Sequence, residues 1–213
     1  MPDAPMPPTY RAPRLFVEGA LSAGARLDLP PEQARYLLTV MRRTSGAPVV
    51  AFNGRDVSWL TRLAPEGRKQ AALIPERLLR PQPTDAEMAA EPWLVFATMK
   101  RQATVLVVEK ATELGCGRFV PVRAQRSNTE RVNQPRLERI AIEAAEQSER
   151  LTVPTFAPLQ SLEALLDAWP DDRMLVVGDE SGMAPPAVET LSARTPRPFA
   201  FLDGPDGGIA PDV

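Results

Sequence analysis

Histidine is absent from this chain of 213 residues, and cysteine occurs once, at Cys116. Without histidine, Ser-His-Asp catalysis, Cys-His catalysis and every histidine-ligated zinc site are excluded within the chain. A single cysteine also excludes thiolate metal sites and an intrachain disulfide. It is typical of a reducing compartment, so we expect a cytoplasmic protein. General acid–base chemistry therefore has to come from Asp, Glu, Lys, Tyr, Cys116 or the substrate itself.

Long apolar runs are also missing. No stretch approaches the roughly 18 apolar residues that a membrane span needs, and the proline-rich segment 1–13 has no apolar core of a secretory signal. We therefore expect no membrane partner. Hydrophobic residues make up 44% and charged residues 24% of the chain, which are ordinary values for a globular protein. The length fits one or two domains that fold without disulfides or metals.

Charge is distributed unevenly along the chain. Residues 1–80 contain 12 Lys and Arg against 7 Asp and Glu, a net charge of +5, whereas residues 81–213 contain 13 against 20, a net charge of −7. A basic N-terminal part favours a polyanionic partner. A solvated surface explains the same charge equally well, so RNA or DNA binding stays one of two readings at this point.

The first 80 residues read as short strands with one helix. We expect strands over residues 14–17, 24–29, 48–52, 57–63 and 70–79, and a helix over residues 31–41 that starts at Pro31. The Asn53-Gly54 pair between two apolar runs predicts a tight hairpin. Several short strands with one helix predict a small β-barrel over residues 1–80.

Residues 81–92 are rich in proline and polar side chains, which predicts a linker. After it the pattern changes to alternation. We expect strands over 93–98, 119–122, 174–177 and 199–202, and helices over 103–114, 135–150, 161–169 and 186–192. Gly115 is expected to end the first of these helices, and Ser161 to cap the third. Strands alternating with helices predict a parallel α/β sheet over residues 93–213.

Ligands of parallel sheets bind at the carboxyl ends of the strands. Two strand ends carry suitable residues, Gly178-Asp179-Glu180 and the glycine-rich segment 204–208. Glycine allows the backbone to approach a ligand closely, although an ordinary turn also explains the second segment. The spacing matches neither the dinucleotide-binding fingerprint nor a P-loop.

Basic side chains form further candidate sites. The segment 123–128 follows a strand and holds two arginines and a serine, a set that can bind phosphate. Arg42 and Arg43 end a predicted helix, where cations are favoured even without phosphate. Lys110 and Arg150 lie on predicted helices, where a solvated surface explains them as well. Cys116 is expected to be buried rather than nucleophilic.

Several motifs are weak signals alone, but their order along the chain is specific. In chain order they are Pro13–Val17, Val40–Arg42, Phe52–Gly54, Lys100, Glu109–Gly115, Gln125–Ser127, Glu143–Arg150 with Pro154, and Asp203–Gly208. This series resembles the RsmE family, the bacterial uracil-N3 methyltransferases of 16S ribosomal RNA in the SPOUT superfamily. Segment 143–150 is the most distinctive match. Asp206 stands where the family usually has Glu, and residues 101–104 depart from the family's usual sequence.

The resemblance implies an α/β protein with two domains. Residues 1–80 would form a PUA-like β-barrel that binds RNA, residues 81–92 a linker, and residues 93–213 a SPOUT methyltransferase domain with a C-terminal trefoil knot. The family sequence continues beyond the position of Val213, so we expect a truncated domain and an incomplete knot in this chain. The resemblance also implies S-adenosylmethionine as cofactor, 16S ribosomal RNA or the small ribosomal subunit as partner, and a homodimer.

The resemblance further implies roles for named residues. The expected catalytic residues are Arg126 and Arg150. The expected cofactor-binding residues are Gly178, Glu180, Gly204, Pro205, Asp206, Gly207 and Gly208, and the expected RNA-binding residues are Arg14, Arg42, Arg43, Lys100 and Lys110. Two alternatives stay open: a non-catalytic protein that binds ribosomal RNA or assists ribosome assembly, and an enzyme that uses a small nucleotide. The sequence identifies neither the modified nucleotide nor a general base.

Overall fold

The computed structural model describes residues 12–67, 69–98, 101–123, 132–178, 184–192 and 197–204. The chain divides into two compact units. The first is Met1–Pro83 with Glu146–Thr152, and the second is Thr84–Ala145 with Val153–Val213. The short segment Glu146–Thr152 thus belongs to the first unit, although the sequence pattern placed it with the residues around it.

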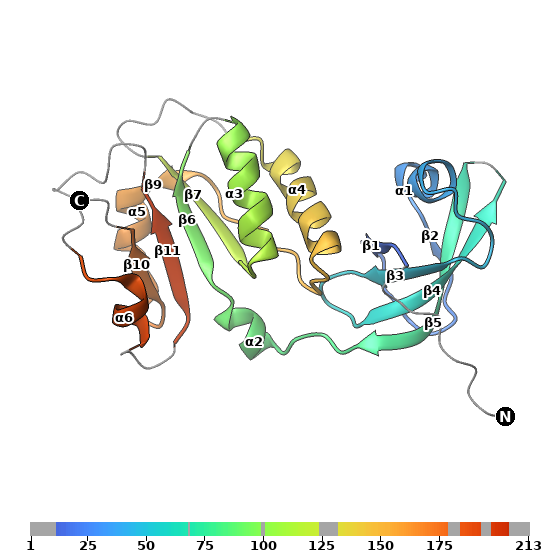
Figure 1. Cartoon of the computed structure of the whole chain (residues 1–213), viewed down its shortest axis with the longest axis horizontal. Coiled ribbons are helices and arrows are strands. Elements are labelled where there is room, and N and C mark those ends of the chain that lie inside the picture. The colour runs from blue at the N-terminus through green and yellow to red at the C-terminus, as the bar shows by residue number, and fades with distance from the viewer. Residues whose placement is uncertain are drawn as a thin grey trace. The chain divides into compact units, whose positions relative to one another are not determined.

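The first unit is built on a mixed five-stranded sheet (Figure 1). Its strands are β1 (Arg14–Phe16), β2 (Leu27–Asp28), β3 (Pro48–Phe52), β4 (Ser58–Glu66) and β5 (Gln70–Arg80), in the order β1-β3-β4-β5-β2. β1 pairs with β3 in parallel, and the other pairs are antiparallel. The second strand is shorter than the predicted 24–29, because Gly24 turns the chain with a φ of 70° and strand pairing begins only at Leu27.

One helical segment packs on this sheet, within the predicted range 31–41. It starts as the α-helix α1 (Pro31–Arg35) and continues as a π-helix, η2 (Tyr36–Val40). The wider winding shows in the hydrogen bond from the Met41 N–H to the Tyr36 carbonyl, at 2.9 Å. Ala34 and Leu37 from this segment are fully buried in the core of the first unit.

The connection between β3 and β4 is a longer loop than the tight hairpin expected at Asn53-Gly54. Residues 53–57 separate the two strands. The Asn53 side chain explains the difference, because its Oδ1 accepts hydrogen bonds from the N–H groups of Arg55 (3.2 Å) and Asp56 (2.8 Å). An Asn side chain that bonds its own loop in this way replaces the ladder bonds of a two-residue turn.

The predicted linker 81–92 is not wholly extended. It contains the helix α2 (Asp85–Ala90), which Thr84 and Glu87 cap reciprocally. The Thr84 Oγ1 accepts from the Glu87 N–H, and the Glu87 carboxylate accepts from the Thr84 N–H. The hydrogen bonds that the Glu87 carboxylate accepts from the Thr84 N–H and from the Thr84 hydroxyl lower the pKa of Glu87. This Thr-x-x-Glu capping box is a helix-start signal that the proline content of the segment had hidden.

The second unit contains a parallel six-stranded sheet. Its strands are β6 (Trp93–Ala97), β7 (Arg118–Arg123), β8 (Thr155–Phe156), β9 (Gln160–Ser161), β10 (Met174–Val177) and β11 (Phe199–Asp203). Their order is β10-β11-β6-β7-β8, and β9 also pairs with β7. The two-residue strands β8 and β9 had no sequence signal, because a pattern of alternation needs more residues than they have.

Helices cover both faces of this sheet (Figure 1). They are α3 (Arg101–Glu113), α4 (Gln134–Gln147), α5 (Leu162–Asp167) and α6 (Ala187–Ser192). Val108 of α3 and Leu137 of α4 are buried against Phe119 on one face. Leu165 of α5 is buried against Val122 on the other face. The described elements therefore form a mixed α/β fold.

Two predicted helix-end residues agree with the structure, and the predicted end of α4 does not. Gly115 ends α3 with a φ of 97°, and the Ser161 Oγ caps α5 by accepting from the Ala164 N–H at 3.1 Å. Helix α4, predicted to reach Arg150, ends at Gln147 instead. Glu149 has a φ of 59°, in the left-handed region, so the helix cannot continue through it. Among the described residues, no helix has the length and apolar character for crossing a membrane.

Candidate functional site

The carboxyl ends of β10, β11 and β6 lie side by side in the second unit. Val177 is paired with Leu202, and Asp203 is paired with Phe96. From β6 the chain proceeds to β7 and β8, then returns to β10 and β11 on the opposite side of β6. The strand order therefore reverses at β6 and β11, and open α/β sheets bind ligands where this reversal occurs.

Two of the glycines predicted to bind a cofactor meet at this place. The Gly178 N–H donates to the Leu202 carbonyl at 3.2 Å, so Gly178 lies directly beside the end of β11. A Cβ on Gly178 would lie 3.4 Å from the ring of Phe201, which is a tight contact. Gly204 follows the last residue of β11. The predicted residues Glu180, Pro205, Asp206, Gly207 and Gly208 lie outside the described residues.

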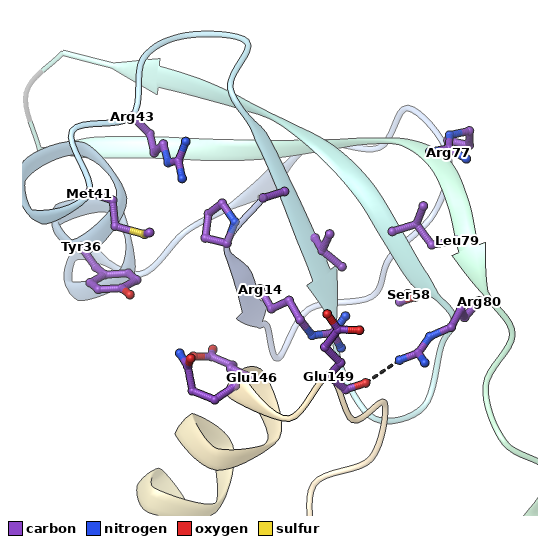
Figure 2. Close-up of a pocket in the computed structure, with 14 residues that line it drawn as sticks. Arg14, Tyr36, Met41, Arg43, Ser58, Arg77, Leu79, Arg80, Glu146 and Glu149 are labelled. Atoms are coloured by element: carbon purple, nitrogen blue, oxygen red, sulfur yellow. Dashed lines mark hydrogen bonds between the residues drawn. The ribbon is translucent and has the colours of Figure 1, made fainter. Parts of the chain in front are cut away.

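A cavity of about 600 Å³ lies in the first unit (Figure 2). It is lined by Ala12, Pro13, Arg14, Tyr36, Met41, Arg43, Val50, Ser58, Arg77, Leu79, Arg80, Glu146, Gln147 and Glu149. Four of these side chains are guanidinium groups and two are carboxylates, so the lining has a net positive charge. We call this cavity the arginine pocket. Its volume is within the range of about 300–1,000 Å³ that is common for ligand sites.

Arg14 is the best-anchored arginine of the pocket. Its Nη2 donates to the Arg150 carbonyl at 2.7 Å, and its guanidinium carbon lies 4.9 Å from the centre of the Phe52 ring. Burial lowers the pKa of Arg14, and the positive charge of Arg80 lowers it further. Glu149 and Glu146 oppose this shift by a smaller amount. Arg14 therefore stays cationic in a partly desolvated place, where its charge acts strongly on a ligand.

The segment Glu146–Thr152 forms one wall of the arginine pocket. The Glu146 Oε1 accepts from the Phe16 N–H at 2.8 Å, and the Glu149 carbonyl accepts from Arg80 Nη2 (Figure 2). Arg150 contributes its carbonyl to Arg14, and its own Nη2 donates to the Thr152 Oγ1 at 2.8 Å. Arg150 therefore lies beyond the end of α4, although it was predicted to lie on this helix.

The side chains of the predicted pair Arg42 and Arg43 lie in different places. Arg42 follows η2 with a φ of 52°, and its side chain is exposed. The Arg43 N–H donates to the Leu37 carbonyl at 2.8 Å, which closes the end of the helix, and the Arg43 side chain lines the pocket. The structure thus brings Arg14 and Arg43 together and leaves Arg42 on the surface.

Lys110 is engaged on its own helix. Its ammonium forms ion pairs with Glu109 at 2.8 Å and with Glu113 at 2.9 Å. The hydrogen bonds to Glu109 and Glu113 raise the pKa of Lys110. Two neighbouring carboxylates leave little positive charge for a phosphate. The predicted Lys100 and Arg126 lie outside the described residues.

Pocket residues that were not identified from the sequence include Tyr36, Arg77 and Arg80. Tyr36 lies on the predicted helix without any signal of its own. Arg77 and Arg80 are three residues apart on β5, a spacing that puts two side chains on opposite faces of a regular strand. Only the irregular pairing of β5 brings them to one face.

The chain is similar to known proteins over most of its length. The family model described as RNA methyltransferase domain matches residues 87–212. Ribosomal RNA small subunit methyltransferase E of Rickettsia conorii is 25% identical over 201 residues, which cover 93% of this chain and 80% of that protein. The protein of the same name from Bacillus subtilis is 24% identical over 210 residues, which cover 92% and 81% of the two chains.

A solved structure is similar over nearly the whole chain. It is the crystal structure of a ribosomal RNA small subunit methyltransferase E from Neisseria gonorrhoeae bound to S-adenosyl methionine, with a TM-score of 0.77 and 26% identity. The similar region covers 95% of this chain and 83% of that chain. Because the family model spans more than half of the sequence, this chain belongs to the RNA methyltransferase family, within the RsmE group.

Proposed function

We propose that this chain is an S-adenosylmethionine-dependent methyltransferase that methylates N3 of a uridine in 16S ribosomal RNA. The observation that carries the proposal is the match of the RNA methyltransferase family model to residues 87–212. The two relatives of the chain described above are named as methyltransferases of small-subunit ribosomal RNA. The ligand-binding end of the parallel sheet supports it, because Gly178 and Gly204 lie at adjacent strand ends where the strand order reverses.

The residues at these strand ends fit a cofactor of this kind. Gly178 has no side chain, so its backbone lies close to the Phe201 ring and the Leu202 carbonyl of β11. We infer that Gly178 and Gly204, with Glu180, Pro205, Asp206, Gly207 and Gly208, hold S-adenosylmethionine. When bound, the cofactor supplies the methyl group. The carboxylates of Glu180 and Asp206 would favour its positive charge.

The chain's remaining task is to present the uracil. N3–H of uracil is weakly acidic and normally lies in a base pair, so the target base has to be unpaired or flipped before it reacts. Positioning the base in line with the methyl group supplies much of the acceleration in such reactions. We propose Arg126 as a residue that orients the base or its phosphate. For Arg150, the hydrogen bond to Thr152 and the carbonyl given to Arg14 support a positioning role.

The proposal includes architecture beyond the mixed α/β fold. We propose that the first unit is a PUA-like RNA-binding barrel over residues 1–80, and that residues 81–92 connect it to a SPOUT methyltransferase domain over 93–213. We also propose a cytoplasmic homodimer that acts on 16S ribosomal RNA or the small ribosomal subunit. The mixed sheet of the first unit and the parallel sheet of the second support this assignment.

Nucleoside mass spectrometry tests the proposed reaction. Unmodified small-subunit RNA and small ribosomal subunits are incubated separately with the chain and S-adenosylmethionine, then digested to nucleosides. We expect new 3-methyluridine in at least one substrate, and none when S-adenosylmethionine is omitted. A methylated nucleoside other than 3-methyluridine would contradict the N3 assignment. Binding of RNA with no methylation and no binding of the cofactor would favour the non-catalytic alternative.

A further inference from the structure

An irregularity in strand pairing builds the floor of the arginine pocket. Leu60 is paired with Arg77 and Ser58 with Arg80, so three residues of β4 oppose four of β5, and the register shifts between Ser58 and Trp59. Such a bulge adds one residue to a strand and changes the direction of the side chains beyond it. Here it puts Arg77 and Arg80 on the same face of the sheet as Ser58, although they are three residues apart.

Three polar groups around the pocket are buried without a partner among the described residues. They are the Ser58 Oγ, the Arg77 Nη2 and the Arg14 Nε. Ser58 is only 1% exposed. A buried donor that makes no hydrogen bond costs about 1–3 kcal/mol, so such groups call for an explanation. All three belong to residues that line one cavity, and all three can donate to the same kind of ligand, an anion with several acceptor oxygens.

Backbone strain is concentrated at the same pocket. Among the described residues, the non-glycine positions with a positive φ are Arg42 and Glu149. Glu149 lines the pocket, and Arg42 directly precedes the lining residue Arg43. The π-helix η2 also lies at the pocket: its first residue, Tyr36, and the residue after its end, Met41, both line it. Left-handed non-glycine residues and π-helical turns are costly and cluster at functional sites.

The charge of the pocket selects the ligand. Four guanidinium groups face two carboxylates, and the Glu146 carboxylate already accepts from the Phe16 N–H. The excess positive charge favours an anion, and guanidinium groups bind phosphate oxygens in pairs. Tyr36 adds an aromatic ring that is 40% exposed and lies beside Met41 at the pocket (Figure 2). A positively charged groove with an exposed aromatic ring is typical of sites for single-stranded nucleic acid.

We propose that the arginine pocket holds a backbone phosphate of the RNA substrate on Arg77, Arg80 and Ser58, with a neighbouring base stacked on Tyr36. The proposal rests on the function proposed above, since it assigns the pocket to the same RNA. It differs from the sequence-based expectation, which placed RNA binding on Arg14, Arg42, Arg43, Lys100 and Lys110. Arg14, anchored to the Arg150 carbonyl, adds positive charge beside the phosphate.

The test measures binding of a fluorescent single-stranded 12-nucleotide oligouridine by anisotropy at several salt concentrations. We expect Arg77→Gln and Arg80→Gln each to weaken binding five- to tenfold. The slope of log K against log salt should become shallower by about 0.7 for each phosphate that the variant no longer neutralises. Tyr36→Ala should weaken binding without changing that slope. Arg80 is exposed, so its variant keeps the test valid even if Arg77→Gln fails to fold.

Arg26→Gln is the matched control. It removes the same charge from the same unit, but Arg26 is paired with Asp28 and Glu66 and does not line the pocket. We expect less than a twofold change for this control. Equal losses of affinity in the control and the pocket variants would overturn the proposal, because they would show a general charge effect. Unchanged RNA affinity in the pocket variants would overturn the proposal as well. If, in addition, inorganic phosphate stabilised the wild type but not the variants, the pocket would be a site for free phosphate.

Two further measurements on the same proteins distinguish a failure of this proposal from a failure of the proposed function. They are calorimetry of S-adenosylmethionine binding and the methylation assay. A wild type that binds the cofactor and methylates RNA, with variants that bind oligouridine normally, would remove the pocket assignment only. Selective loss of oligouridine binding in the variants, with no methylation by the wild type, would support the pocket and contradict the enzymatic function.

Discussion

At the scale of single residues, Arg173 holds three backbone carbonyl groups of the second unit. Its Nη1 donates to the carbonyls of Glu91 (3.0 Å) and Phe199 (2.9 Å), and its Nη2 donates to the carbonyl of Ala89. The guanidinium carbon also lies 4.0 Å from the centre of the Trp93 ring. Burial lowers the pKa of Arg173. An arginine suits this position because its planar group donates in several fixed directions at once.

Replacing Arg173 should therefore destabilise the second unit. Arg173→Met removes three hydrogen bonds that a charged group donates to partly buried carbonyls, which we expect to lower the free energy of unfolding by roughly 3 kcal/mol. Arg173→Lys should recover less than half of this stability, because one ammonium cannot reach all three carbonyls. Urea denaturation measures both. Arg139→Met, on the exposed side of α4, is the control and should change stability by less than about 0.5 kcal/mol. A destabilisation no larger than that of the control would contradict this role of Arg173.

At the scale of elements, the loop between β3 and β4 is held by two side chains. Asn53 Nδ2 donates to the Asp56 Oδ2 at 2.6 Å and to the Gly19 carbonyl at 3.0 Å. Asp56 Oδ2 also accepts from the Leu21 N–H at 3.0 Å. The hydrogen bond from Leu21, followed by that from Asn53, lowers the pKa of Asp56. The charged carboxylate therefore ties the loop to the segment that follows β1.

This geometry predicts a pH dependence of stability. A carboxyl whose pKa is lowered by folding stabilises the folded state above its unfolded pKa of about 3.9, and the stabilisation is lost as the pH falls through the folded pKa. Asp56→Asn should lower the free energy of unfolding by about 1–2 kcal/mol at pH 6. The difference between wild type and variant should stay constant from pH 7 to pH 5 and shrink below about pH 4. Denaturation curves at each pH measure it, and a difference independent of pH would contradict the carboxylate's role.

At the scale of the whole molecule, each unit has its own hydrophobic core. The core of the first unit contains Leu37 and Leu63, and the core between the sheet of the second unit and helices α3 and α4 contains Phe119 and Val108. All four side chains are at most 1% exposed. A unit with its own core can lose structure locally while the other stays folded.

Hydrogen exchange measures whether the cores act separately. Leu37→Ala should cost about 3 kcal/mol, which raises exchange of the most protected amides in β3 and β4 by about a hundredfold. Amides of β6 and β7 should change less than twofold. Phe119→Ala should give the reverse pattern. If either variant accelerated exchange in both sheets to the same degree, the chain would unfold as one cooperative unit.

Much of the fold could be predicted because its elements have strong local patterns. The strands β3 and β10 begin and end at the predicted residues, since each is an apolar run bounded by turn-forming residues. The candidate site was harder to predict. Gly178 and Gly204 were identified, because glycine after a buried strand is a local signal. Tyr36 and Arg80 were missed, because nothing near them in the sequence marks them as neighbours.

The sequence by itself determined the alternation of strands and helices in the second unit, the strand-rich first part, and the chemistry that the absence of histidine excludes. These follow from composition and from apolar spacing, which act over a few residues. Only the tertiary structure decided which charges meet. The bulge beside Ser58, the left-handed residue Glu149 and the return of segment Glu146–Thr152 to the first unit together assemble the arginine pocket. Such contacts join residues as far apart in the sequence as Arg14 and Arg150, and no local pattern encodes a pairing over that separation.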